Sequence, residues 1–139
     1  MRVYLLLLCL LGTSTLLSQY HSDALRLSKM EYMKYAGRTD CNGDFNSSLE
    51  HRICLNLEFQ KVDSLLNVNF KKVCEAIDEP SVKNQIIEYH ESWIDYRRLQ
   101  AKLVSKGYRG HMLGIVYLGS MVEMTKRRSQ DLNDLIRGY

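Results

Sequence analysis

The sequence has very little proline and contains no long hydrophobic run. One proline and eight glycines in 139 residues leave little material for a turn-rich β architecture. No stretch of 18 or more apolar residues occurs, which excludes a multi-span membrane protein. The formal net charge of +3 is too small and too evenly mixed for a nucleic-acid binder. With 45% hydrophobic residues the chain is not disordered, and its length suits one domain.

The first 18 residues have the order of a secretory signal peptide. Arg2 supplies the positive start, residues 3–11 are an unbroken apolar run, and small residues follow up to Ser18. Nine apolar residues are too few to span a bilayer. We therefore expect cleavage after Ser18 and a secreted or periplasmic protein with no stable membrane anchor afterwards. Losing Arg2 lowers the formal net charge from +3 to +2.

Three cysteines lie beyond this segment, so an oxidising compartment favours one disulfide and leaves one thiol over. Cys41 and Cys54 flank a polar stretch with a strong turn signal, Asn-Gly-Asp, at 42–44. We expect these two to be bridged. Cys74 lies within a helical pattern, which predicts a buried free thiol that packs as a small hydrophobe.

Apolar residues recur every three or four positions in three segments, 47–77, 81–105 and 111–136, and no segment alternates like a strand. Ser47 or Ser48 is a suitable N-cap for the first helix, and Pro80 ends it. Ser81 is the expected cap of the second, and Gly107 its stop. Short connections predict an all-α, up-down-up three-helix bundle in one domain, residues 40–139. Residues 19–39 form an N-terminal extension with a short helical segment.

The predicted inward positions of the three helices are Ile53, Leu57, Val62, Leu66, Phe70, Val73 and Ile77, then Val82, Ile86, His90, Trp93, Arg97 and Ala101, then Ile115, Leu118, Met121, Met124, Leu132 and Leu135. Arg97 is unusual there, because an unpaired buried charge costs several kcal/mol. Asp63 is its natural partner, and Asn67, one turn further along, is expected to satisfy remaining donors. Thr125 and Arg128 complete this polar layer.

These residues stand in an order and spacing that resembles the lysozyme inhibitor LprI-like family. Its pattern reads D-x-x-L-N-x-x-Y/F, then Q-x-x-W-x-x-x-R, then L/M-T-x-x-R-x-x-x-L, on secreted helical domains. The matching residues are Asp63, Leu66, Asn67, Phe70, His90, Trp93, Arg97, Thr125, Arg128 and Leu132. Cys41 and Cys54 also look like the family's first cysteine pair. His90 replaces the family's glutamine, and Ala101 and Ser120 stand where a second cysteine pair is expected.

The resemblance implies a binding protein, not an enzyme, that inhibits lysozyme by occlusion. Lysozymes of the c type are generally basic, so inhibition by this cationic chain needs a local acidic patch or a loop inserted in the cleft. The alternative is an envelope or host-facing interaction module with another extracytoplasmic partner and no inhibitory activity. The sequence leaves the oligomeric state and the role of Cys74 open.

No catalytic or metal-binding set occurs in the sequence. No serine lies in a G-x-S-x-G elbow, and the four histidines are scattered without the spacing that zinc requires. We expect no cofactor and no metal. Glu91, Asp95, Arg98 and Lys102 read as a solvated helix face. The polar layer around Arg97 is either a structural layer that fixes helix register or a ligand site.

One exposed segment combines binding-type residues. Residues 107–111 hold Tyr108, Arg109 and His111 in a loop bounded by glycines. Binding residues often lie on loops, and Tyr and Arg are favoured interface anchors. The segment is therefore a candidate binding loop, with a simple helix–helix turn as the alternative.

Overall fold

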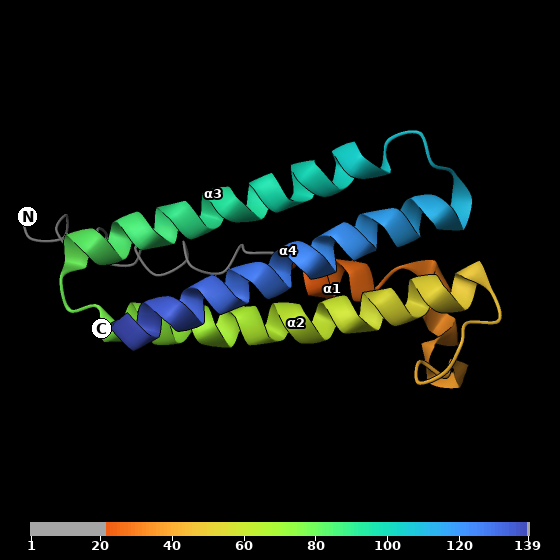
Figure 1. Cartoon of the computed structure of the whole chain (residues 1–139), viewed down its shortest axis with the longest axis horizontal. Coiled ribbons are helices and arrows are strands. Elements are labelled where there is room, and N and C mark those ends of the chain that lie inside the picture. Colours follow the sequence, from red (N-terminus) through yellow and green to blue (C-terminus); the bar gives the residue numbers. More distant parts are fainter. Residues whose placement is uncertain (1–21, 139) are drawn as a thin grey trace, which may run out of the picture.

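The structure is a computed structural model that describes residues 22–138, and within this part of the chain every regular element is a helix and no strand occurs. Its elements are α1 (Asp23–Ser28), the 3-10 helix η1 (Glu31–Arg38), α2 (Ser48–Ala76), α3 (Pro80–Ser105) and α4 (Gly110–Gly138). The three long helices run up, down and up, and α4 lies between α2 and α3 (Figure 1). The predicted all-α three-helix bundle is confirmed. The predicted signal peptide, residues 1–18, lies outside the described residues.

A serine caps the N-terminus of α2, and a proline is the first residue of α3. The Ser47 hydroxyl accepts a hydrogen bond from the backbone N–H of Glu50 at 3.2 Å, and the Glu50 carboxylate accepts one from the N–H of Asn46 at 2.7 Å. The expected capping role of Ser81 is wrong. Glu79 is the N-cap of α3 and Pro80 its first residue, because the fixed φ of proline suits that position.

Two apolar clusters form the core. One joins Leu27, Phe59, Ala101, Leu118, Met121 and Val122, and the other joins Leu66, Val73, Ile77 and Leu132. Two predicted inward residues are wrong, because Leu57 and Leu135 are 37% and 43% exposed. The buried face of α2 turns toward Phe59, because α1 packs on α2 beside α4. Leu57, two positions away, then points to solvent.

The disulfide prediction is confirmed. Cys41 and Cys54 are bridged with Cα atoms 5.5 Å apart, which ties the loop before α2 to its first turns. Cys74 is free but only half-buried, which corrects its expected burial. It follows the buried Val73 by one position and so lies at the edge of the core. Partial burial raises the pKa of its thiol. No helix within residues 22–138 is long and apolar enough to cross a membrane.

Candidate functional site

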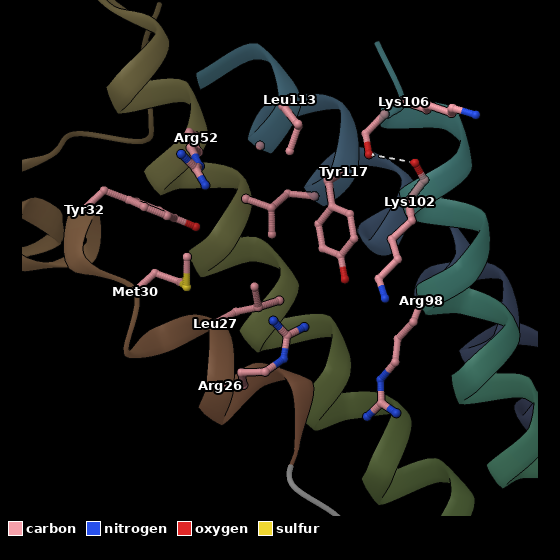
Figure 2. A pocket seen from close by; sticks show the side chains of 13 residues that line it. Arg26, Leu27, Met30, Tyr32, Arg52, Arg98, Lys102, Lys106, Leu113 and Tyr117 are labelled. Carbon is pink, nitrogen blue, oxygen red and sulfur yellow. Dashed lines mark hydrogen bonds between the residues drawn. The ribbon is translucent and has the colours of Figure 1, made fainter. Parts of the chain in front are cut away.

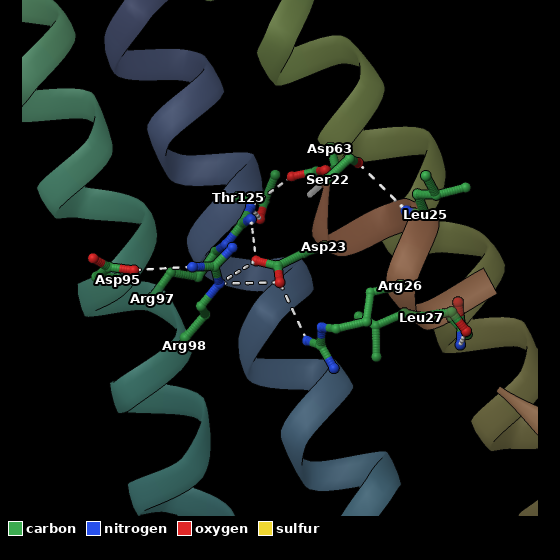
Figure 3. Close-up of polar contacts among 11 residues, drawn as sticks. Ser22, Asp23, Leu25, Arg26, Leu27, Asp63, Asp95, Arg97, Arg98 and Thr125 are labelled. Atoms are coloured by element: carbon green, nitrogen blue, oxygen red, sulfur yellow. Dashed lines mark hydrogen bonds and ion pairs between the residues drawn. The ribbon is translucent and has the colours of Figure 1, made fainter. Parts of the chain in front are cut away.

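The side chain of Arg97, on α3, is the centre of a buried polar layer. Arg97 is 1% exposed. Its Nη1 donates to Asp63 Oδ1 on α2 at 2.7 Å and to Thr125 Oγ1 on α4 at 2.8 Å. Its Nη2 donates to Asp23 Oδ2 at 3.0 Å, so one guanidinium joins four helices (Figure 3). Such charge-assisted bonds are the stronger class of protein hydrogen bond. The Asp63–Arg97 pair and the Thr125 contact agree with the sequence prediction.

Asp23 is a second acid in this layer that sequence reasoning missed. It is the first residue of α1 and 2% exposed. Besides Arg97 it accepts hydrogen bonds from Arg98 Nε at 3.0 Å and from Arg26 Nη2 at 3.2 Å. Burial would raise the pKa of Asp23, but the hydrogen bond from Arg98 and the charges of Arg97 and Arg98 outweigh burial and lower it. Arg98 itself is half-buried, so it does not belong to the predicted solvated face.

Aromatic rings fill the space around the two buried arginines. The Arg97 guanidinium carbon lies 5.1 Å from the ring centroids of both Phe59 and Trp93. The guanidinium carbon of Arg128 lies 4.5 Å from the Tyr89 ring and 5.7 Å from the Trp93 ring. Arg128 Nε is buried and has no hydrogen-bond partner within the described chain. Arg128 thus joins the layer through aromatic faces, and Trp93 is half-buried between the two cations.

His90 extends the layer toward the second apolar cluster. It is 4% exposed and stacks on Phe70 with ring centroids 3.8 Å apart. Burial, together with the charges of Arg128 and Arg97, lowers the pKa of His90 to about 4. The imidazole is therefore neutral at pH 7. It packs as an aromatic ring at the position where the family pattern has glutamine.

The expected role of Asn67 is wrong. Asn67 is exposed and belongs to the groove between α2 and α3, because a four-residue step rotates a side chain about 40° around the helix. A buried amide two positions further along α2 is Asn69, which donates to Ser129 Oγ at 2.8 Å. The other motif residues lie inward: Leu66 and Thr125 are fully buried, and Phe70 is half-buried.

The candidate binding loop lies at the end of the bundle where α3 meets α4 (Figure 1). Tyr108 is 47% exposed, and Arg109 and His111 are exposed as well. Gly107 has φ 99° and Gly110 has φ 56°, the left-handed region that favours glycine. The two glycines hold three side chains out from a short, defined turn. This loop and the buried layer are different parts of the molecule.

A sequence model of the family described as "Lysozyme inhibitor LprI" matches residues 40–132. The chain belongs to the lysozyme inhibitor LprI family. A search of curated proteins and a search of solved structures each found no match. The description of that family names lysozyme inhibition.

The match to the LprI family covers the three long helices up to Leu132 and excludes α1 and η1. Asp23 therefore reaches the buried layer from outside the matched region. Among residues 22–138 no three His, Cys, Asp or Glu side chains are placed to hold a metal ion. Arg97, Asp63 and Thr125 are at most 4% exposed, so the buried layer presents almost no surface to a protein partner. Asp63 and Arg97 do contribute to the lining of the groove between α2 and α3.

Proposed function

We propose that the protein is exported, that its domain comprises residues 40–139, and that it inhibits lysozyme by occlusion. Membership of the LprI family carries the proposal, because that family's description names lysozyme inhibition. The signal-like first 18 residues, with cleavage after Ser18, agree with export. The contact surface in this proposal is the α3–α4 loop with Tyr108, Arg109 and His111.

The chemistry of a glycosidase cleft suits this loop. Such enzymes flank the scissile bond with two carboxyl groups. The guanidinium of Arg109 can pair with a carboxylate through two parallel hydrogen bonds, and Tyr108 offers a rigid apolar face of the kind that anchors interfaces. A cationic loop in an acidic cleft also explains how two cationic proteins can associate, since the attraction is local and the net charges are screened.

The test is lysis of bacterial cell walls by lysozyme with and without the purified mature protein. We expect inhibition that Arg109→Glu and Tyr108→Ala each weaken about tenfold or more, as for interface hot spots. Arg127→Glu on the exposed face of α4 makes the same change in net charge and is the matched control. Loop variants that inhibit as well as the unchanged protein would refute the loop as the contact surface.

The second candidate is a non-inhibitory envelope or host-facing interaction module. One observation favours it: Arg52, Lys102 and Lys106 line a cavity at the loop end of the bundle, and a basic enzyme would be repelled there. A folded protein that leaves lysozyme fully active would select this candidate.

A further inference from the structure

A cavity of about 550 Å³ opens at the loop end of the bundle, between α1 and the long helices (Figure 2). Its volume is in the range of small-molecule binding sites. Two almost fully buried leucines, Leu27 and Leu118, belong to its lining, and Met30, Leu113 and Tyr117 add further apolar surface. The cavity therefore offers a ligand a substantial apolar contact.

The charged side chains of this cavity are all cations. They are Arg26, Arg52, Arg98, Lys102 and Lys106, and no Asp or Glu is among the lining residues. Asp23, from outside the lining, pairs with Arg26 and Arg98. Lys102 and Lys106 form no ion pair with any residue in the range 22–138. The cavity thus keeps an excess of positive charge that the described chain does not neutralise.

Arg52 belongs to the lining of this cavity and forms no ion pair with the described residues. Its guanidinium carbon sits 4.1 Å from the centroid of the Tyr32 ring. Its Nε is buried and has no hydrogen-bond partner among the described residues. A buried donor without a partner is unfavourable, so an acceptor supplied by a ligand would stabilise this arrangement.

A glycine makes room for this arginine. Gly114 is buried within α4, where glycine is less favourable for the helix than alanine. A Cβ at residue 114 would lie 2.1 Å from Arg52 Nε and 2.5 Å from its guanidinium carbon. Any larger residue would force the Arg52 side chain to move. The position of Arg52 therefore depends on the absence of a side chain at residue 114.

We propose that this cavity binds a small amphipathic anion. An alkyl or similar apolar group lies against Leu27 and Leu118, and a carboxylate or phosphate is held by Arg52 and Lys102. Arginine matches either anion through two parallel hydrogen bonds, and lysine adds a point charge. The proposal does not depend on lysozyme inhibition. The ligand would bind at the cationic end of the bundle whether or not the protein inhibits lysozyme.

Isothermal titration calorimetry of the purified mature protein tests this with three probes that share one chain length: octanoate, octyl phosphate and the neutral 1-octanol. We expect at least one anion to bind with a Kd of about 1 mM or tighter, and 1-octanol to bind about tenfold more weakly. Tighter binding of octyl phosphate assigns a phosphate headgroup, and tighter binding of octanoate a carboxylate. No heat from either anion, or equal binding of 1-octanol, would overturn the proposal.

Variants locate the site. Arg52→Gln and Lys102→Gln should each weaken anion binding about tenfold while leaving 1-octanol unchanged. Gly114→Ala should match Arg52→Gln, because it displaces the same guanidinium. Arg127→Gln removes an exposed cation that does not line this cavity and should leave affinity unchanged. If Gly114→Ala unfolds the protein, the Lys102→Gln and Arg52→Gln variants still test the site, because Lys102 is exposed. Unchanged affinity in both variants would refute the site.

Discussion

Asp23→Asn removes one charge from the buried layer while keeping the shape of the side chain. In the native protein Asp23 and Arg97 form an ion pair whose side chains are 1% and 2% exposed. Asparagine can still accept hydrogen bonds at its carbonyl oxygen, but its carboxamide carries no charge and its NH2 group places donors against three guanidinium groups. The substitution therefore tests how much the contact between α1 and α3 contributes to stability.

The stability lost in Asp23→Asn depends on which partners of Asp23 can be solvated. Removing one member of a buried ion pair costs about 3–5 kcal/mol. The side chains of Arg26 and Arg98 are 51% and 33% exposed and can regain water, and Arg97 keeps Asp63 at 2.7 Å. One buried pair is lost, so we expect the low end of the range, about 3 kcal/mol at pH 7.

The pH dependence has a definite sign. The pKa of Asp23 in the folded protein is below its ordinary value of 3.8, so on acidification the unfolded chain takes up this proton first. The stabilisation is complete above the unfolded pKa and is lost as the pH falls through the folded pKa. The difference in unfolding free energy between Asp23→Asn and the unchanged protein should therefore shrink below about pH 4.

Urea denaturation at pH 7 and at pH 3 or below measures this difference. Asp95→Asn is the matched control, because Asp95 also binds Arg98, at 2.9 Å, but its side chain is 78% exposed. We expect that control to change stability by less than about 0.5 kcal/mol. The reasoning is refuted if Asp23→Asn is as mild as Asp95→Asn, or if its cost is the same at both pH values.

Four further predictions follow from the same structure. Arg97→Ala should cost about 3–5 kcal/mol, because two buried acids lose their cation, and Trp93→Ala about 3 kcal/mol, because it is half-buried; an unchanged Tm in either would place that residue outside the core. Peptide mapping without reduction should find Cys41 linked to Cys54 and Cys74 free, and reduction should cost about 3 kcal/mol. As the pH falls from 6.5 to about 4, the unfolded chain binds a proton that the buried, neutral His90 does not bind, so the free energy of unfolding should fall by up to about 1.4 kcal/mol per pH unit. His90→Gln should abolish this loss, and urea midpoints measured across that range check it. Ala101→Cys combined with Ser120→Cys should form a bridge in the exported protein, and two free thiols in a non-reducing map would break the correspondence with the family's second cysteine pair.

The sequence predicted the parts of the layer that depend on helical period and charge balance. Three segments with apolar residues every three or four positions became α2, α3 and α4, and a buried Arg97 required an acid, which Asp63 supplies. The prediction for Asn67 was wrong because nothing in the local sequence shows whether an amide at the edge of the apolar helix face points to the core or to solvent. The burial of Asn69 depends on its contact with Ser129 on α4.

Other features arise only when distant segments meet. Asp23 and Arg97 are 74 positions apart, and no spacing rule relates a residue before the first long helix to one on the second. The cationic cavity is similar, because Arg52 comes from α2 and Lys102 from α3. Each of these side chains reads in the sequence as an ordinary surface charge. The packing of α1 and α4 between them creates the site.

The residues that connect this chain to the LprI family are mostly inside the bundle, so effects of substitutions on stability and on inhibition can be measured at different residues. Arg97, Asp63 and Thr125 hold helices together and are almost fully buried, so they offer a protein partner almost no contact surface in the folded state. Tyr108 and Arg109 are exposed and lie outside the motif. It follows that Arg97→Ala should lower stability and inhibition together, whereas Arg109→Glu should lower inhibition with the Tm unchanged. A variant of Arg109 that loses both would show that the loop supports the fold, and the contact surface would then have to lie elsewhere.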